Sequence, residues 1–260
     1  MDTRPIGMFD SGCGGLTVLK EYIKKLPNED FIYYGDTAHL PYGDKSKEKI
    51  IEYSEKIVDF LMNQEVKMIV IACGPASASA YEDLKEKYPN IPIKNIIEPT
   101  AKLLTDENIG VIATKTTIRS KAWENSILKY HPSAKIKSLA CPLLVPLIEE
   151  GFTNHSATDL ILKDYLRAFF EREDILEKPS ISSLILGCTH YPILKNQIQE
   201  ILGNTVNVIN VGTYSANDTD QFLKENHFQN SPSHSGKLEF YSSDDFMTFR
   251  ENAKLLDFII

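Results

Sequence analysis

Short apolar segments alternate along this chain with longer segments in which apolar and polar residues are mixed. Six of the short segments have the length and composition of buried strands: 6–9, 31–34, 68–72, 109–113, 135–140 and 183–187. Since segments with helical periodicity lie between them, the order is typical of parallel sheets flanked by helices. The pattern therefore predicts an α/β protein.

The segments between the predicted strands favour amphipathic helices. In residues 45–63, six apolar side chains recur at helical spacing and form one face: Ile50, Ile51, Ile57, Val58, Leu61 and Met62. Further helices are expected at 17–26, 77–88, 118–130 and 159–171. The sequence NHFQNSPSHSGK (226–237) is the most loop-like part of the chain and is interpreted as a surface excursion.

A weak internal repeat divides the chain into two similar parts. IGMFDSGCGGLTVL (6–19) and IGVIATKTTIRSKAW (109–123) both show a strand, a polar turn and a helix. IVIACGPASA (69–78) and LILGCTHYP (184–192) both run an apolar strand directly into a cysteine. Chance similarity between α/β segments is the alternative. The shared position of the cysteine favours two related α/β halves over a solenoid.

Composition and charge narrow the class of protein. Hydrophobic residues make up 42% and charged residues 25% of the 260 positions, as in soluble globular proteins, and this excludes general disorder. A net charge of −8 argues against nucleic acid and anionic membranes as partners. No apolar run approaches the ~20 residues of a membrane span, and no secretory leader is expected. Four cysteines fit a reducing cytosol, so a cytoplasmic protein is predicted.

Candidate chemistry lies where the predicted strands end, because ligands of open α/β sheets bind outside the carboxyl ends of the strands. Cys73 and Cys188 each follow an apolar strand and precede a helix, whose N-terminus lowers the pKa of a thiol. Asp10 ends another strand within FDSGCGG (9–15), where the glycines allow backbone N–H groups to converge on an anion. His190 lies two residues beyond Cys188.

Two thiols, a carboxylate and an imidazole on two related halves suit a stereoinversion. One group removes a proton from a carbon, and a group on the opposite face returns one. The alternative is that the cysteines only pack in the core, as free cysteines commonly do. This alternative is preferred for Cys141, which has no base beside it, and it stays open for Cys13, which shares a turn with Asp10.

Other kinds of site find less support. Cys73, Cys188, His190 and Asp10 could ligate zinc, but the chain has no C-x-x-C pair, so no metal is predicted. The sequence DSGCGG matches neither a dinucleotide-binding nor a P-loop motif. Pyridoxal phosphate would need a Schiff-base lysine, which has no local signature, and the sequence leaves that cofactor open.

Five segments together resemble glutamate racemases of the aspartate/glutamate racemase superfamily: FDSGCGGLTV (9–18), YYGDTAHLPYG (33–43), IACGPASA (71–78), CPLLVPLIEEG (141–151) and LGCTHYP (186–192). The resemblance implies a cofactor-independent enzyme that interconverts L- and D-glutamate for peptidoglycan synthesis, and a cytoplasmic homodimer. It also implies two pseudo-symmetric α/β domains with mostly parallel sheets and the active site at their interface. The first domain would comprise 1–97 and 210–260, and the second 98–209.

The resemblance further implies roles for individual residues. Cys73, assisted by Asp10, would take the α-proton from D-glutamate, and Cys188, assisted by His190, would take it from L-glutamate. The residues implied to line the substrate site are Ser11, Tyr42, Gly43, Gly74, Pro75, Thr117, Glu149 and Thr189.

One position departs from the family pattern. Relatives normally carry Asn-Thr after the first catalytic cysteine, whereas this chain carries Gly74 and Pro75. Neither residue has a side-chain donor, and proline also lacks a backbone N–H. Each hydrogen bond lost to a charged group is worth about 1.5–3 kcal/mol. Three interpretations follow: a glutamate racemase with an altered carboxylate site, a racemase for aspartate or another acidic amino acid, and a catalytically impaired homologue that binds an amino acid or a partner protein.

Overall fold

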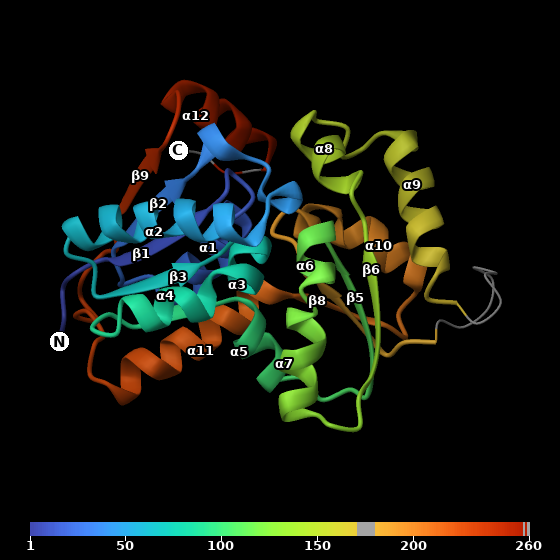
Figure 1. The fold of residues 1–260 in the computed structure, drawn as a ribbon, viewed down its shortest axis with the longest axis horizontal. Helices are drawn as coiled ribbons and strands as arrows, with labels where there is room; N and C mark the ends of the chain where they lie inside the picture. The colour runs from blue at the N-terminus through green and yellow to red at the C-terminus, as the bar shows by residue number, and fades with distance from the viewer. Residues whose placement is uncertain (171–179, 257, 259–260) are drawn as a thin grey trace.

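The computed structural model of the chain describes residues 1–170, 180–256 and 258. In these residues the strands form two sheets that lie side by side, each flanked by helices (Figure 1). Every strand pairing recorded is parallel. The prediction of an α/β protein with parallel sheets is therefore confirmed. No helix of the described part is both long enough and apolar enough to cross a membrane.

The first sheet has the strand order β4-β3-β1-β2-β9. Its strands are β1 Ile6–Asp10, β2 Phe31–Gly35, β3 Met68–Ile71, β4 Ile93–Asn95 and β9 Leu238–Ser242. Successive side chains of β1 and β3 enter opposite layers of the core, as the twofold period of a strand requires. Met68 and Val70 join one buried cluster, whereas Ile69 and Ile71 join the other.

Helices cover both faces of the first sheet. They and the adjoining 3₁₀ turns are α1 Leu16–Lys25, η1 Thr37–His39, η2 Tyr42–Asp44, α2 Lys47–Asn63, α3 Gly74–Ser79, α4 Tyr81–Lys87, α5 Ile97–Lys102, α11 Val211–Glu225 and α12 Phe246–Leu255. Buried residues of α1 and α11 belong to the cluster that contains Met68 and Val70. Those of α2 and α4 belong to the other cluster, so the sheet is enclosed between the two helix layers.

The second sheet has the strand order β6-β5-β7-β8. Its strands are β5 Asn108–Ala113, β6 Lys135–Ala140, β7 Ser183–Leu186 and β8 Asn207–Asn210. The helical elements around it are α6 Lys115–Arg119, α7 Ala122–Tyr130, α8 Leu144–Glu149, α9 Ser156–Arg167, η3 Tyr191–Leu194 and α10 Lys195–Leu202.

All six predicted strands are present, within one residue of their expected ends. The helix predicted at 77–88 is found in two pieces, because α3 and α4 meet at Ala80, whose φ of −112° interrupts the helix. The helix predicted at 118–130 is also divided, because Lys121 adopts a left-handed backbone with φ of +56° and separates α6 from α7. The helix expected at 159–171 is found as α9, and residue 171 lies outside the described residues.

The two sheets lie on opposite sides of the predicted domain boundaries near Glu98 and Asn210. Helices α5 and α11, which adjoin those boundaries, pack against each other, and α6 of the second half packs against η2 of the first. The larger buried cluster contains side chains from both sheets, among them Met8 and Ile112. The division into two domains stays a prediction.

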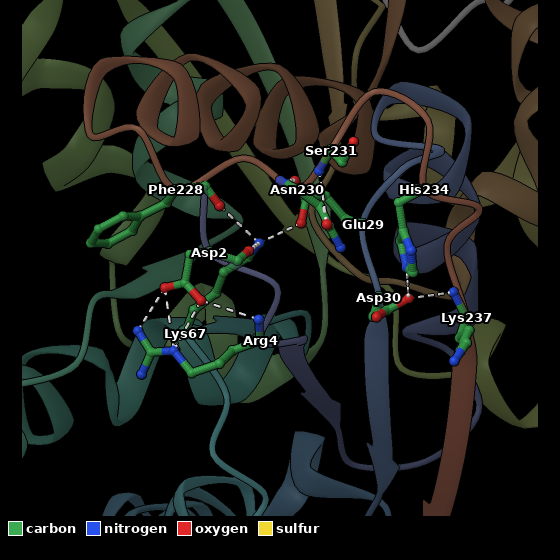
Figure 2. Close-up of polar contacts among 10 residues, drawn as sticks. All are labelled: Asp2, Arg4, Glu29, Asp30, Lys67, Phe228, Asn230, Ser231, His234 and Lys237. Atoms are coloured by element: carbon green, nitrogen blue, oxygen red, sulfur yellow. Dashed lines mark hydrogen bonds and ion pairs between the residues drawn. The ribbon is translucent and has the colours of Figure 1, made fainter.

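The loop-like segment 226–237 contains no helix or strand, but it is anchored more firmly than a surface excursion (Figure 2). The fully buried Lys67 ammonium pairs with the Glu29 carboxylate and donates to the Phe228 carbonyl oxygen at 2.9 Å. Glu29 in turn accepts a hydrogen bond of 2.8 Å from the backbone N–H of Asn230, which is buried. These contacts fix the segment against the amino ends of β2 and β3.

Candidate active site

A cavity opens where the carboxyl ends of strands from both sheets face each other. Ten of the residues predicted for the site line this cavity: Asp10, Ser11, Tyr42, Gly43, Cys73, Pro75, Glu149, Cys188, Thr189 and His190. The first half contributes the ends of β1 and β3 and the loop at η2. The second half contributes the end of β7 and helix α8.

On the first side of the cavity, the buried Cys73 thiol lies between β3 and α3. Burial raises its pKa well above the ordinary value, and the Asp10 carboxylate raises it further. Hydrogen bonds from Ala76 and Ser11 oppose this shift only in part. Cys73 is therefore a protonated thiol at neutral pH.

Asp10 ends β1 and is also buried. The backbone N–H of Gly12 donates to its Oδ1 at 2.9 Å, so the turn after the strand holds the carboxylate in place. Burial raises the pKa of Asp10, and the positive charge of His190 and hydrogen bonds from Gly12 and Gly15 partly oppose that effect. A carboxyl group with a raised pKa is better able to accept and return a proton than an ordinary aspartate.

On the second side, the Sγ of Cys188 lies 3.8 Å from Nδ1 of His190. The Nε2 of the same ring lies 3.1 Å from Oε1 of Glu149, which is carried by α8. Burial lowers the pKa of His190, but the Cys188 thiol and the Glu149 carboxylate outweigh burial and raise it to about 10. The ring is therefore an imidazolium at neutral pH, and a cation in this position stabilises negative charge on the Cys188 sulfur.

Hydrogen bonds connect the two sides of the cavity. The Thr189 hydroxyl donates to Oδ2 of Asp10 at 3.4 Å, and the Thr17 hydroxyl of α1 donates to the Thr189 carbonyl oxygen at 2.6 Å. The loop at η2 is held in the same way, because the Thr116 hydroxyl donates to the Gly43 carbonyl oxygen at 2.6 Å. These bonds fix the relative positions of the reactive groups across the seam between the halves.

Two predicted site residues do not line the cavity. Thr117 is fully buried, and its Oγ1 lies 3.1 Å from Oγ1 of Thr114. Gly74 faces the backbone of the other half: a Cβ at this position would lie 2.7 Å from the Gly187 carbonyl oxygen. The loops that carry Cys73 and Cys188 thus approach each other backbone to backbone.

Several lining residues were not expected from the sequence: Leu40, Pro41, Asp44, Thr114, Lys115, Cys141, Pro142, Val145 and Pro146. Thr114 and Cys141 directly follow β5 and β6, so the rule about strand ends could have identified them. Val145 and Pro146 reach the cavity through the packing of α8, for which the sequence gives no signal.

The two remaining cysteines differ in position. Cys141 is buried, as the packing interpretation requires, but it also lines the cavity. The Cys13 thiol contacts the Phe249 carbonyl oxygen at 3.4 Å. Burial raises the pKa of Cys13 to about 12, with smaller contributions from Asp10 and Glu149, and this favours a packing role. Among the described residues, no group of three or more His, Cys, Asp or Glu side chains is arranged to hold a metal ion.

Comparison with known proteins shows what this chain is similar to. Residues 12–217 match the family model described as Asp/Glu/Hydantoin racemase. The chain is 40% identical over 248 residues to the glutamate racemase of Geobacter metallireducens, covering 94% of this chain and 89% of that protein. It is 41% identical over 251 residues to the glutamate racemase of Neisseria meningitidis serogroup A, covering 95% and 90%.

A solved structure agrees with these sequence matches. The crystal structure of glutamate racemase from Francisella tularensis in complex with D-glutamate superimposes with a TM-score of 0.89 at 38% identity. The superposition covers 100% of this chain and 96% of that one.

Proposed function

Because the chain belongs to the Asp/Glu/Hydantoin racemase family, we propose that it is a glutamate racemase, which interconverts L- and D-glutamate. The family membership confirms the resemblance that the sequence motifs indicate. Glutamate is favoured as the substrate because the relatives described above are glutamate racemases and match almost the whole chain.

The observation that carries the proposal is the position of the two thiols. Cys73 and Cys188 follow the strands β3 and β7 of two different sheets, and both line one cavity. A racemisation needs one group to remove the α-proton from one face of the substrate and another to donate a proton to the opposite face. The electron pair of the broken C–H bond stays on the substrate as an enolate until the new C–H bond forms.

The surroundings of the thiols support a role for each of them. With L-glutamate, Cys188 is the base, because the His190 imidazolium beside it stabilises the thiolate, and Cys73 is the acid. With D-glutamate the roles reverse, and Asp10 assists proton removal by Cys73. Each turnover leaves the two sulfurs ready for the opposite direction.

The protein must also stabilise the substrate carboxylate as it gains enolate character. Ser11 and Thr189 line the cavity, and their hydroxyl groups can turn from Cys73 and Asp10 to donate to this carboxylate when substrate binds. Pro75 removes one backbone donor at the start of α3. The depth at which Asp10, Cys73 and Cys188 are buried strengthens the remaining dipoles, because water is excluded from around them.

The cellular setting is also part of the proposal. D-Glutamate made by this chain would supply peptidoglycan synthesis in the cytoplasm, and the chain would act as a homodimer with domains 1–97 plus 210–260 and 98–209. All four cysteines are free and buried, which suits a reducing compartment. Sedimentation equilibrium of the purified protein tests the dimer.

Exchange of the α-proton, followed by NMR in deuterated buffer, tests the activity. The substrates are L- and D-glutamate and L- and D-aspartate. Exchange with inversion of glutamate is expected. Inversion of aspartate alone would show that Gly74 and Pro75 change the substrate. Absence of exchange from folded, reduced protein on all four substrates would refute the proposal and favour an impaired homologue.

A further inference from the structure

The cavity needs a cation to bind the second carboxylate of the substrate, and the residues discussed so far do not supply one. Glutamate brings two carboxylates to a chain whose net charge is −8. The cavity itself contains three acidic side chains, those of Asp10, Asp44 and Glu149. Of its two cationic residues, His190 is already engaged with Cys188 and Glu149. The other is Lys115.

The backbone at Lys115 is held at the seam between the two halves. Lys115 is the first residue of α6, and the next residue, Thr116, donates its hydroxyl hydrogen bond to Gly43 of the loop at η2. The loop at η2 also packs on Thr114, the residue before Lys115, since a Cβ on Gly43 would lie 3.1 Å from Cβ of Thr114. The start of this side chain is therefore fixed while its four-carbon stem stays free to reorient.

The charge of Lys115 is also available to a ligand. Across residues 1–170, 180–256 and 258, its ammonium group has no ion-pair or hydrogen-bond partner, and the residue is exposed at the mouth of the cavity. Cys73 and Cys188 lie at the buried end. A substrate whose α-carbon lies between the two thiols directs its side chain away from them, toward the mouth.

We propose that Lys115 binds the side-chain carboxylate of the substrate and so sets the preference for an acidic amino acid. This inference depends on the proposed racemase function. An ammonium attracts a carboxylate more strongly than a neutral donor does, so its loss should be visible in substrate binding. Lys115 acts in binding and does not move a proton.

The test is steady-state racemisation of L- and D-glutamate by Lys115→Arg, Lys115→Gln and Lys115→Glu. The KM is expected to stay within a few-fold of the wild-type value for Arg, to rise about 10- to 100-fold for Gln, and to rise further for Glu. The kcat should change less than threefold throughout, because the reacting groups are untouched. The matched control is Lys45→Gln, which removes a charge near the same loop but outside the cavity lining, and its KM should not change.

An unchanged KM in Lys115→Gln, an equal rise in Lys45→Gln, or a loss confined to kcat would each overturn the proposal. Added salt gives an independent readout. It should raise the KM of the wild type and have a smaller effect on Lys115→Gln, and equal salt dependence would count against the pairing. If the wild type itself exchanges no α-proton, the racemase function fails, and this result is distinct from a failure of the role of Lys115.

Discussion

Replacement of Gly74 by alanine should separate the two reactive loops. The Cβ of the new residue would lie 2.7 Å from the Gly187 carbonyl oxygen, whereas ordinary contacts begin near 3.4 Å. The obstacle is backbone, which cannot rotate away as a side chain can. The loops that carry Cys73 and Cys188 must therefore move apart by about 0.7 Å, the difference between these two distances.

This displacement predicts two measurable losses. A misplacement of about 1 Å between reacting groups can cost about 100-fold in rate, so we expect the kcat of Gly74→Ala to fall roughly 10- to 100-fold in both directions. Overpacking lowers the free energy of unfolding by about 1–3 kcal/mol, and the lower entropy of the unfolded chain with alanine offsets about 0.4–1 kcal/mol of this loss. The variant should stay folded with a Tm lowered by several degrees.

The assay combines racemisation kinetics, thermal unfolding and the fluorescence of Trp123. This residue is the only tryptophan of the chain and is buried, and its Nε1 lies 2.7 Å from where a Cβ on Gly187 would be. Its emission should change in Gly74→Ala because Gly187 moves. The double variant Gly74→Asn with Pro75→Thr meets the same obstacle and should not gain activity. A higher Tm, unchanged emission and unchanged kcat in Gly74→Ala would refute the reasoning.

Three further predictions concern the thiols, the imidazolium and the buried ion pair. Cys73→Ser and Cys188→Ser should each abolish the inversion of glutamate, because a serine hydroxyl is far harder to deprotonate than a thiol. Chiral chromatography of the reaction mixture measures the inversion, and near wild-type rates in either variant would contradict the two-thiol mechanism. His190→Asn should slow turnover of L-glutamate more than that of D-glutamate, and equal losses would contradict the assignment of His190 to Cys188. Because the folded pKa of His190 is raised from 6.5 to about 10, its imidazolium stabilises the fold fully below pH 6.5 and loses this contribution as the pH rises through about 10. Urea unfolding at pH 6, 8 and 10 should therefore show the advantage of the wild type over His190→Asn shrinking with pH, and a constant difference would argue against a charged ring. Lys67→Met should lower the free energy of unfolding by about 3–5 kcal/mol, because it leaves the buried Glu29 carboxylate without its cation, whereas the exposed control Lys56→Met should cost at most about 1 kcal/mol. Equal effects of the two lysine variants in urea unfolding would show that the buried pair contributes little.

The central strands could be predicted from the sequence because they are enclosed by helices on both faces. Such strands, for example β3 and β1 before its final Asp10, are runs of buried residues without a polar side chain, which a short window detects. The strands that were missed, β4, β8 and β9, are all at sheet edges. An edge strand has fewer buried positions, as the exposed and half-buried residues of β9 illustrate, and its pattern resembles that of a loop.

The helix breaks were missed for a different reason. Hydrophobic periodicity continues across Ala80 and Lys121, because both flanking helices bury side chains in the same core. Only the backbone angles at these two residues end one helix and start the next. Neither residue is the glycine or proline that usually marks such a break.

The sequence by itself determined which groups end the strands: Asp10, Cys73 and Cys188 follow apolar runs, and the position of an active site at strand ends is a property of α/β sheets. The tertiary structure alone decided which groups meet. The pairing of His190 with Glu149, the contact of Gly74 with Gly187 and the place of Lys115 at the cavity mouth depend on how the two sheets dock. That docking follows from side-chain packing between segments far apart in the chain, and no local pattern of residues encodes it.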